Sequence, residues 1–433
     1  MQGIIVFILV FFIVVTVHEL GHFIAAKRAG ILCQEFAIGF GPKIFHKKIG
    51  ETNFTIRLLP VGGYVKMPDN VFDFNNEVSP YDIKKGMKVY LKLDENNCVE
   101  KIVLDNTNDP EYVSLEVNEY DLTEKLFIDG FSSGGQDLEY YKVNENACVV
   151  FSGMEEQIAP IHRMFSSHSW YKKFITLFAG PLMNFILALL IFIGMAAYNG
   201  VPMDKVVVGN VLENSPAQKY GLLVNDEIKE INGVQVNNWS EFKNEVVNIK
   251  ENTIDLKIVR DSKEEIIKLN PEIVSDPDNK GKEVKKYYLG IEQKLEKNFV
   301  KSISYGAKET LYYSTLIFTG IIKLFSSIFT GGFSLDQLGG PVAIYEITSN
   351  VAKNGLFTTL RWIGLLSVNL GLMNLIPIPV LDGGRIIFVL YEGIFKKPIS
   401  KKAQYYATAV FSVLLIILML AVTWNDITRL FNK

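Results

Sequence analysis

Four long runs of apolar residues alternate with polar segments along the chain. The runs lie at about 4–26, 174–198, 356–378 and 405–424. A helix needs about 20 predominantly apolar residues to cross the hydrocarbon core of a bilayer, and each run is long enough. The pattern therefore predicts a polytopic α-helical membrane protein with about four transmembrane helices.

Basic residues beside these runs predict how the helices are oriented. They follow the first run, precede the second and separate the last two, as Lys27, Arg28, Lys43, Lys47 and Lys48, then Lys172 and Lys173, then Lys396, Lys397, Lys401 and Lys402. Because Lys and Arg are enriched on the cytoplasmic side, we expect all three clusters in the cytoplasm and both termini outside it. A fifth apolar stretch, 311–329, contains Lys323 and is expected on the membrane surface, since a fifth crossing would place one cluster outside. No basic residue precedes the first run and no small-residue cleavage site follows it, which argues against a signal peptide.

Two polar blocks separate the apolar runs. Residues 69–160 contain 20 Asp and Glu against 7 Lys and Arg, a net charge of −13 in a chain whose total is −3. Alternating apolar and polar residues at 87–93, followed by a polar turn at 94–97, predict β-hairpins in this block. We expect a cytoplasmic, acidic, β-rich insertion there. The second block, 201–293, lies between the second and third runs and is therefore expected outside the cytoplasm.

Composition agrees with a membrane protein that has soluble parts. Hydrophobic residues make up 48% of the chain and charged residues 21%, and the mean hydropathy is +0.18. A net charge of −3 and plentiful aromatic residues exclude a disordered, collagenous or nucleic-acid-binding chain. The three cysteines, Cys33, Cys98 and Cys148, have no metal-binding or disulfide spacing.

Three ionisable residues, His18, Glu19 and His22, interrupt the first apolar run. The pattern His-Glu-x-x-His is typical of zinc proteases, because histidines four apart share one helix face and can reach one metal ion. Glu19 is the candidate general base for an attacking water, which zinc makes more acidic. The alternative is a chance match. Unpaired ionisable side chains in an apolar span cost free energy, so we favour a functional site.

A zinc site usually has three protein ligands, so a further donor is required. The other histidines lie in polar surroundings and are expected to be ordinary surface residues: His46, His162 and His168. Asp382 is the better candidate. Pro377 and Pro379 break the helix before it, and unwound backbone at membrane depth is tolerated only beside a cavity or within protein. Its alternative role is to cap the following helix, 383–395, and the residues alone leave both roles open.

The two motifs, His18 to His22 and Asn374 to Gly384, resemble the site-2 protease family of intramembrane zinc proteases, in particular its bacterial regulator-of-sigma (RseP-like) branch. Supporting segments are Gly39-Phe40-Gly41-Pro42, Gly62-Gly63-Tyr64-Val65-Lys66-Met67, and Ala179-Gly180-Pro181 followed by Asn184. The resemblance implies that His18, His22 and Asp382 bind Zn²⁺. It also implies that Asn374 contacts the substrate or its oxyanion.

The same resemblance places a membrane-associated β-hairpin at 31–68, next to the zinc. An exposed strand edge there would pair with an unwound substrate through residues Gly62, Gly63, Tyr64 and Val65. The alternative is a plain connecting hairpin, which the glycines alone would favour.

The outer block, 201–293, follows the motif order of a PDZ-like domain. The motifs are Ser215-Pro216-Ala217, Gly221-Leu222, Asp226-Glu227-Ile228, Ile231-Asn232-Gly233 and Leu289-Gly290-Ile291. Asn225 replaces the usual glycine before the aspartate, and Asn also adopts a positive φ. The alternative is a small β-rich domain that binds no peptide.

Together these expectations divide the chain into eight segments: transmembrane helix 1 at 1–30, the hairpin at 31–68, the insertion at 69–160, transmembrane helix 2 at 161–200, the PDZ-like domain at 201–293, an amphipathic surface helix and loop at 294–350, transmembrane helix 3 with the second motif at 351–395, and transmembrane helix 4 at 396–433.

The functional hypothesis is an intramembrane zinc endopeptidase of a bacterial cytoplasmic membrane. Its expected substrates are pre-trimmed, single-pass transmembrane proteins, such as anti-sigma factors or signal-peptide remnants. The PDZ-like domain would exclude bulky ectodomains or hold a peptide. One alternative is a non-proteolytic scaffold or transporter with a structural metal site. Another is a membrane-anchored protease for soluble chains, which the position of His18 within an apolar run disfavours.

Overall fold

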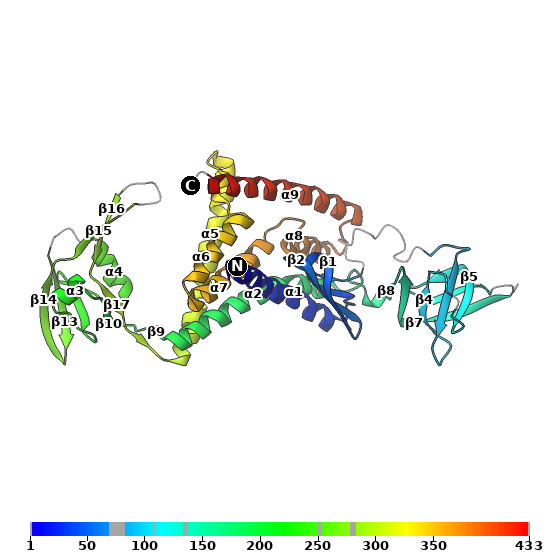
Figure 1. Cartoon of the computed structure of the whole chain (residues 1–433), viewed down its shortest axis with the longest axis horizontal. Helices are drawn as coiled ribbons and strands as arrows, with labels where there is room; N and C mark the ends of the chain where they lie inside the picture. The colour runs from blue at the N-terminus through cyan, green and yellow to red at the C-terminus, as the bar shows by residue number, and fades with distance from the viewer. Residues whose placement is uncertain are drawn as a thin grey trace. The chain divides into compact units, whose positions relative to one another are not determined.

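The structure is a computed structural model that describes residues 2–68, 83–107, 109–132, 137–248, 253–277 and 283–431. Contacts divide the chain into two compact units, one formed by 1–189 with 310–433 and the other by 190–309. Each unit is described by itself below, with elements labelled as in Figure 1.

Five of the described helices are long and apolar enough to cross a membrane. They are α1 (Gln2–Ala29), α2 (Trp170–Asn199), α5 (Phe299–Thr330), α7 (Leu356–Asn374) and α9 (Lys401–Phe431). The additional candidate is α5, which contains the stretch expected on the membrane surface. The count of four spans therefore remains a prediction from charge.

The segment expected as one third span, 351–395, is divided into separate helices. After α6 (Pro341–Lys353) and α7, the backbone leaves the helix at 375–381 and a new helix, α8, spans Asp382–Phe395. Pro377 and Pro379 lie in the break, where a proline cannot continue the hydrogen-bond pattern. The helix break that the prolines predict is thus present. It makes Asp382 the first residue of a new helix.

A small sheet lies against α1 and consists of β1 (Glu35–Ile49) and β2 (Thr52–Lys66) (Figure 1). Both strands are long and bent, so that 35–38 pairs on one side with 53–56 and on the other with 63–66. Residues 43–49 pair with 52–57. The segment 63–66 therefore lies at one edge of this sheet. Gly39 permits the bend: its φ is +87°, and an added Cβ would be 3.1 Å from the Arg57 carbonyl oxygen.

The acidic insertion folds as a six-stranded sheet. Its strands are β3 (Lys88–Leu93), β4 (Val99–Val103), β5 (Tyr112–Asp121), β6 (Phe127–Ser132), β7 (Leu138–Phe151) and β8 (Met154–Gln157). The order is β4-β3-β5-β6-β7-β8, and an additional pairing of β4 with β7 closes the first five strands on themselves. Alternating side chains such as Val89, Leu91 and Leu115 fill the core. The alternation at 87–93 corresponds to β3, and residues 69–82 of the insertion lie outside the described residues.

Ion pairs and a hydrogen bond join β8 of the insertion to the β1–β2 sheet. Lys48 donates to Glu155 at 2.9 Å and Lys66 donates to Glu156 at 2.7 Å, while the Gln34 amide donates to the Gln157 carbonyl at 2.8 Å. The Lys48 hydrogen bond to the Glu155 carboxylate is the main reason that the pKa of Glu155 falls to about 2. The acidic charge of the insertion is thus partly matched by the basic charge of the hairpin.

The second unit contains a four-stranded sheet of order β12-β11-β13-β14 and several two-stranded pairings. Its elements are β9 (Val201–Pro202), β10 (Val208–Val211), α3 (Pro216–Lys219), β11 (Glu227–Ile231), β12 (Val234–Gln235), α4 (Trp239–Val247), β13 (Ile254–Arg260), β14 (Lys263–Leu269), β15 (Glu272–Pro277), β16 (Glu283–Tyr288), β17 (Ile291–Gln293) and β18 (Leu295–Glu296). Ile228, Leu256 and Phe242 are among the residues of its core. Asn225 has a φ of +77°, as expected for a residue that replaces glycine.

Short 3₁₀ turns at Ile161–Arg163 and Leu335–Gln337, both in the first unit, complete the described elements.

Candidate metal centre

Helices α1 and α8 bring His18, His22 and Asp382 together although Asp382 follows His22 by 360 positions in the sequence. The Nε2 atoms of the two histidines are 3.2 Å apart. Each of them lies 3.2 Å from Oδ2 of Asp382. All three side chains are buried. The donors that sequence spacing and resemblance suggested therefore converge on one point.

The arrangement of these atoms fits a tetrahedral metal ion. Bonds of about 2.0 Å in a tetrahedral site hold the donor atoms about 3.3 Å apart, close to the spacing of the triangle formed by His18, His22 and Asp382. Oδ2 of Asp382 is buried and accepts no well-directed hydrogen bond. Two imidazoles and one carboxylate are a donor set that zinc proteases use. The residues present therefore suit Zn²⁺.

Asp382 does not act as the helix cap that was its alternative role. The N-cap of α8 is Leu381, and no side chain caps this helix end. Gly383 and Gly384 allow the helix to start so close to the preceding turn. A Cβ on Gly383 would be 2.5 Å from the Leu375 carbonyl carbon, and one on Gly384 would be 2.5 Å from Pro379 N.

Helix α2 fixes the ring of His22. Its Nδ1 lies 2.8 Å from the Thr176 carbonyl oxygen, which can only accept, so Nδ1 carries the proton and Nε2 presents its lone pair to the ligand triangle. Gly180 lies directly against the ring: a Cβ there would be 2.7 Å from Cδ2 of His22. On α1, Gly21 packs on Ala179 and would clash with its backbone if it had a side chain. Close packing of α1 on α2 thus explains Gly21 and Gly180.

Glu19 lies beside the triangle in a cavity of about 200 Å³. The edge segment of the small sheet forms one wall: a Cβ on Gly63 would be 2.8 Å from Cγ of Glu19. Tyr64, Val65 and Asn374 also line the cavity. Gly62 does not line the cavity. It packs instead on the ring of Phe40, whose Cε2 would be 2.7 Å from a Cβ added at this glycine. Except for Gly62, every site residue expected from the sequence therefore lines one cavity.

Polar contacts hold Tyr64 in place at the sheet edge. The Glu35 carboxylate accepts hydrogen bonds from Thr55 at 2.7 Å, Arg57 at 2.8 Å and Tyr64 at 3.0 Å. Burial opposes ionisation of Glu35, but these three donors outweigh it and lower the pKa of Glu35. Burial and the neighbouring carboxylate raise the pKa of Tyr64 to about 12. The strand next to the cavity is therefore tied to two other segments of its sheet.

Arg385 lines the cavity as well and was not expected from the sequence. It lies one helical turn after Asp382, on α8. The available signal was a charged residue inside an otherwise apolar segment, which usually indicates a functional or paired group. The three remaining histidines, His46, His162 and His168, do not line the cavity, as expected.

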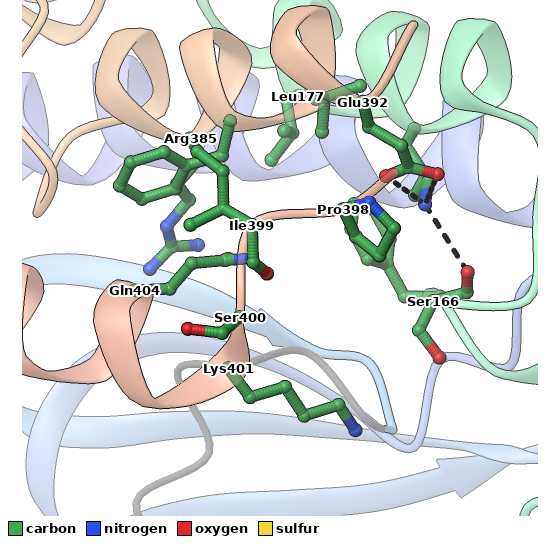
Figure 2. Close-up of a pocket in the computed structure, with 13 residues that line it drawn as sticks. Ser166, Leu177, Arg385, Glu392, Pro398, Ile399, Ser400, Lys401 and Gln404 are labelled. Atoms are coloured by element: carbon green, nitrogen blue, oxygen red, sulfur yellow. Dashed lines mark hydrogen bonds and ion pairs between the residues drawn. The ribbon is translucent and has the colours of Figure 1, made fainter. Parts of the chain in front are cut away.

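A second cavity, of about 230 Å³, adjoins the first and shares Leu177 and Arg385 with it. Figure 2 shows these two residues, with Ser400 and Gln404, among those that line it. Lys173 donates to both oxygens of Glu392 at 2.6 Å and to the Ser166 carbonyl at 3.3 Å, the bonds dashed in Figure 2. This ion pair joins α2, which orients His22, to α8, which carries Asp382.

Comparison with known proteins finds relatives that match almost the whole chain. The model of Peptidase family M50 matches residues 6–418. The chain belongs to this family. Regulator of sigma-W protease RasP of Bacillus subtilis is 39% identical over 432 residues, covering 99% of each chain. Zinc metalloprotease RasP of Bacillus licheniformis is 40% identical and covers both chains completely, and a Staphylococcus aureus relative is 44% identical over 99% of this chain and 98% of its own.

The M50 assignment agrees with the resemblance to site-2 proteases. The chain is a zinc metalloprotease of a family that performs regulated intramembrane proteolysis. A non-proteolytic scaffold or transporter is therefore not its function. Among solved structures, the PDZ domain of an SdrC-like protein from Listeria monocytogenes is 26% identical, covers 22% of this chain and 90% of its own, and has a TM-score of 0.17. A TM-score this low does not establish a shared fold, so the PDZ-like assignment of 201–293 stays a prediction.

Proposed function

We propose that His18, His22 and Asp382 hold the zinc ion and that Glu19 is the general base of this M50 protease. The convergence of three donor atoms at 3.2 Å beside Glu19 carries the proposal. A zinc ion held there supplies Lewis acidity, which polarises a peptide carbonyl and makes water acidic enough to attack near pH 7. Glu19 positions the attacking water, takes its proton and passes it to the leaving amine.

Asn374 and the sheet edge are the proposed substrate contacts. Asn374 lies at the end of α7, on the wall of the cavity, where its amide can donate to the developing oxyanion. Peptide carbonyls of a helix are bonded within the helix, so a transmembrane substrate must unwind before attack. The edge segment 63–66 offers backbone groups with which an unwound strand can pair, and Gly63 sets its distance from Glu19.

Single-pass membrane proteins cut near their cytoplasmic end are the proposed substrates. The B. subtilis relative is named a regulator of sigma-W protease. On this basis we propose anti-sigma factors as one substrate class and signal-peptide remnants as another. The block 201–293, which the charge argument predicts outside the cytoplasm, would exclude substrates with bulky ectodomains, so that an earlier trimming step permits the cut. This topology puts both termini outside the cytoplasm.

The decisive experiment replaces Glu19 by Gln in the full-length chain. We expect zinc content to stay at about one ion per chain while cleavage of a model transmembrane substrate falls about 10²–10⁴-fold, the usual loss of a general base. Glu100→Gln, on the exposed surface of the insertion, is the matched control and should change neither quantity. Undiminished cleavage by the Glu19 variant would reject the mechanism.

Two further measurements test the ligands and the substrate class. Asp382→Ala should lose zinc, and a variant that retains a full complement of metal would remove Asp382 from the ligand set. Deletion of 203–290 should admit untrimmed substrates, and unchanged selectivity would reject the exclusion role. Casein offered beside the transmembrane substrate should remain uncut, since the centre is buried among helices.

A further inference from the structure

Asn184, on α2, contacts the face of His18 that points away from the ligand triangle. Its side chain is fully buried, at 0% exposure. Its amide nitrogen lies 3.1 Å from Nδ1 of His18. Its amide oxygen is buried and has no hydrogen-bond partner. The side chain is therefore held against a proposed zinc ligand. Its amide nitrogen can only donate a hydrogen bond to His18, whereas its oxygen can only accept one.

The proton on His18 decides which of the two amide atoms must face it. A neutral imidazole carries one proton, and a lone pair on Nε2 requires that proton on Nδ1. With the amide nitrogen facing Nδ1, the proton would be on Nε2. It would then point at His22 and Asp382, into the space that suits a metal ion. A metal-binding His18 thus needs an acceptor at Nδ1.

The amide oxygen of Asn184 can provide this acceptor. Amide oxygen and nitrogen are assigned from hydrogen bonding rather than from atomic shape, and a half-turn of the side-chain amide exchanges them. After this turn, Nδ1–H of His18 donates to the Asn184 oxygen. His22 already has the equivalent arrangement, because its Nδ1 faces the Thr176 carbonyl at 2.8 Å.

The backbone of Asn184 is fixed by α7, which carries none of the three ligand residues. Ser367 donates from Oγ to the Asn184 carbonyl at 2.8 Å. Gly371 leaves room for α2: a Cβ there would be 3.2 Å from the Pro181 carbonyl and 3.4 Å from Cβ of Asn184. The position of the amide is therefore set by helix packing rather than by rotation of a loose side chain.

We propose that Asn184 is a positioning residue that accepts the Nδ1 proton of His18, fixing the tautomer and ring orientation in which His18 binds zinc. The proposal rests on the ligand set put forward above. Such outer contacts to a metal-binding histidine typically change metal affinity 10–100-fold. Asn184, which follows Ala179-Gly180-Pro181 in the sequence, thereby acquires a physical role in orienting a zinc ligand.

Zinc affinity of two Asn184 variants tests the proposal, measured on full-length protein by competition with a chelator of known affinity. Asn184→Leu keeps the approximate volume but has no acceptor, and we expect its zinc dissociation constant to rise 10–100-fold. Asn184→Asp offers only acceptors, and we expect its dissociation constant to stay close to the wild-type value rather than to rise 10–100-fold. Absorption of the cobalt-loaded variants reports ligand geometry independently of activity.

The outcomes separate this inference from the proposed ligand set. His18→Ala is the reference: if it binds zinc like the wild type, the ligand set itself is wrong. If His18→Ala loses zinc but both Asn184 variants bind it normally, only the positioning role is refuted. If Asn184→Asp and Asn184→Leu weaken zinc binding equally, the positioning role is also refuted. Equal weakening would mean that Asn184 acts through packing or by donating a hydrogen bond, because both variants lack the amide donor and only Asp keeps an acceptor.

Discussion

Gly180→Ala should disable the metal centre through one methyl group. Gly180 lies on α2 directly against the ring of His22, and the three atoms nearest to an added Cβ all belong to this ring. Alanine is otherwise favourable in a helix, by about 1 kcal/mol relative to glycine. Any loss of function therefore arises from the contact with His22 and not from the helix.

The geometry gives the size of the effect. A Cβ at Gly180 would be 2.7 Å from Cδ2 of His22, whereas carbon atoms in contact lie about 3.5–4.0 Å apart. The ring must move by about 1 Å, well beyond the roughly 0.2 Å by which metal–ligand distances vary. We expect zinc affinity to fall at least 10-fold and kcat/KM to fall about 100-fold, the loss typical of a 1 Å displacement in an active site.

Gly194→Ala provides the matched control, because this glycine lies on the same helix and a Cβ there meets nothing within 4 Å. Both variants should show the same helix content and membrane insertion. Zinc is measured by chelator competition and cleavage with a model transmembrane substrate. If Gly180→Ala binds zinc and cleaves like Gly194→Ala, the position of His22 described here is wrong.

Three further perturbations should have distinct results. Gly63→Ala should lower kcat/KM about 100-fold while zinc stays bound, since a Cβ there would be 2.8 Å from Cγ of Glu19 and its three nearest atoms belong to no proposed zinc ligand; zinc loss would contradict this. Lys173→Met should lower the free energy of unfolding by about 2 kcal/mol, because it leaves a partly buried carboxylate unpaired. The double variant Lys173→Met with Glu392→Leu should lower it by less, and thermal unfolding in detergent compares the two. Hydrogen bonds from Lys48, and to a smaller extent from Cys148 and Lys101, lower the pKa of Glu155 from 4.5 to about 2. Their stabilisation is therefore complete above pH 4.5 and is lost only as the pH falls towards 2. Hydrogen exchange of β8, corrected for intrinsic rates, should therefore not change between pH 7 and pH 5.

Local features of the site could be predicted because they depend on spacing along one element. The histidines of α1 share a face as a consequence of their four-residue separation. Pro377 and Pro379, two residues apart, predict that the helix before them ends. The positive φ of Asn225 likewise follows from the residue type.

Features that depend on partners far along the chain could not be predicted from the residues alone. Asp382 had two possible roles because a carboxylate at a helix start can either cap the helix or bind a distant group. Only the approach of α8 to α1 distinguishes them. Asn184 contacts a residue 166 positions away, and no periodicity reports such a contact. Arg385 gave a signal, an isolated charge in an apolar segment, but nothing in the sequence says what it faces.

Long-range packing also explains why glycines accompany the residues of this site. Two helices that bring ligands to one ion must approach closely, and Gly21 and Gly180 let α1 and α2 do so. Gly383 allows α8 to begin beside the preceding turn, and Gly63 brings the sheet edge to Glu19. Each of these positions would clash if it had a Cβ, whereas Gly194 and Gly320, on two of the long helices, have nothing within 4 Å. A glycine next to a ligand motif therefore indicates where another segment must pass, even when the sequence does not reveal which segment it is.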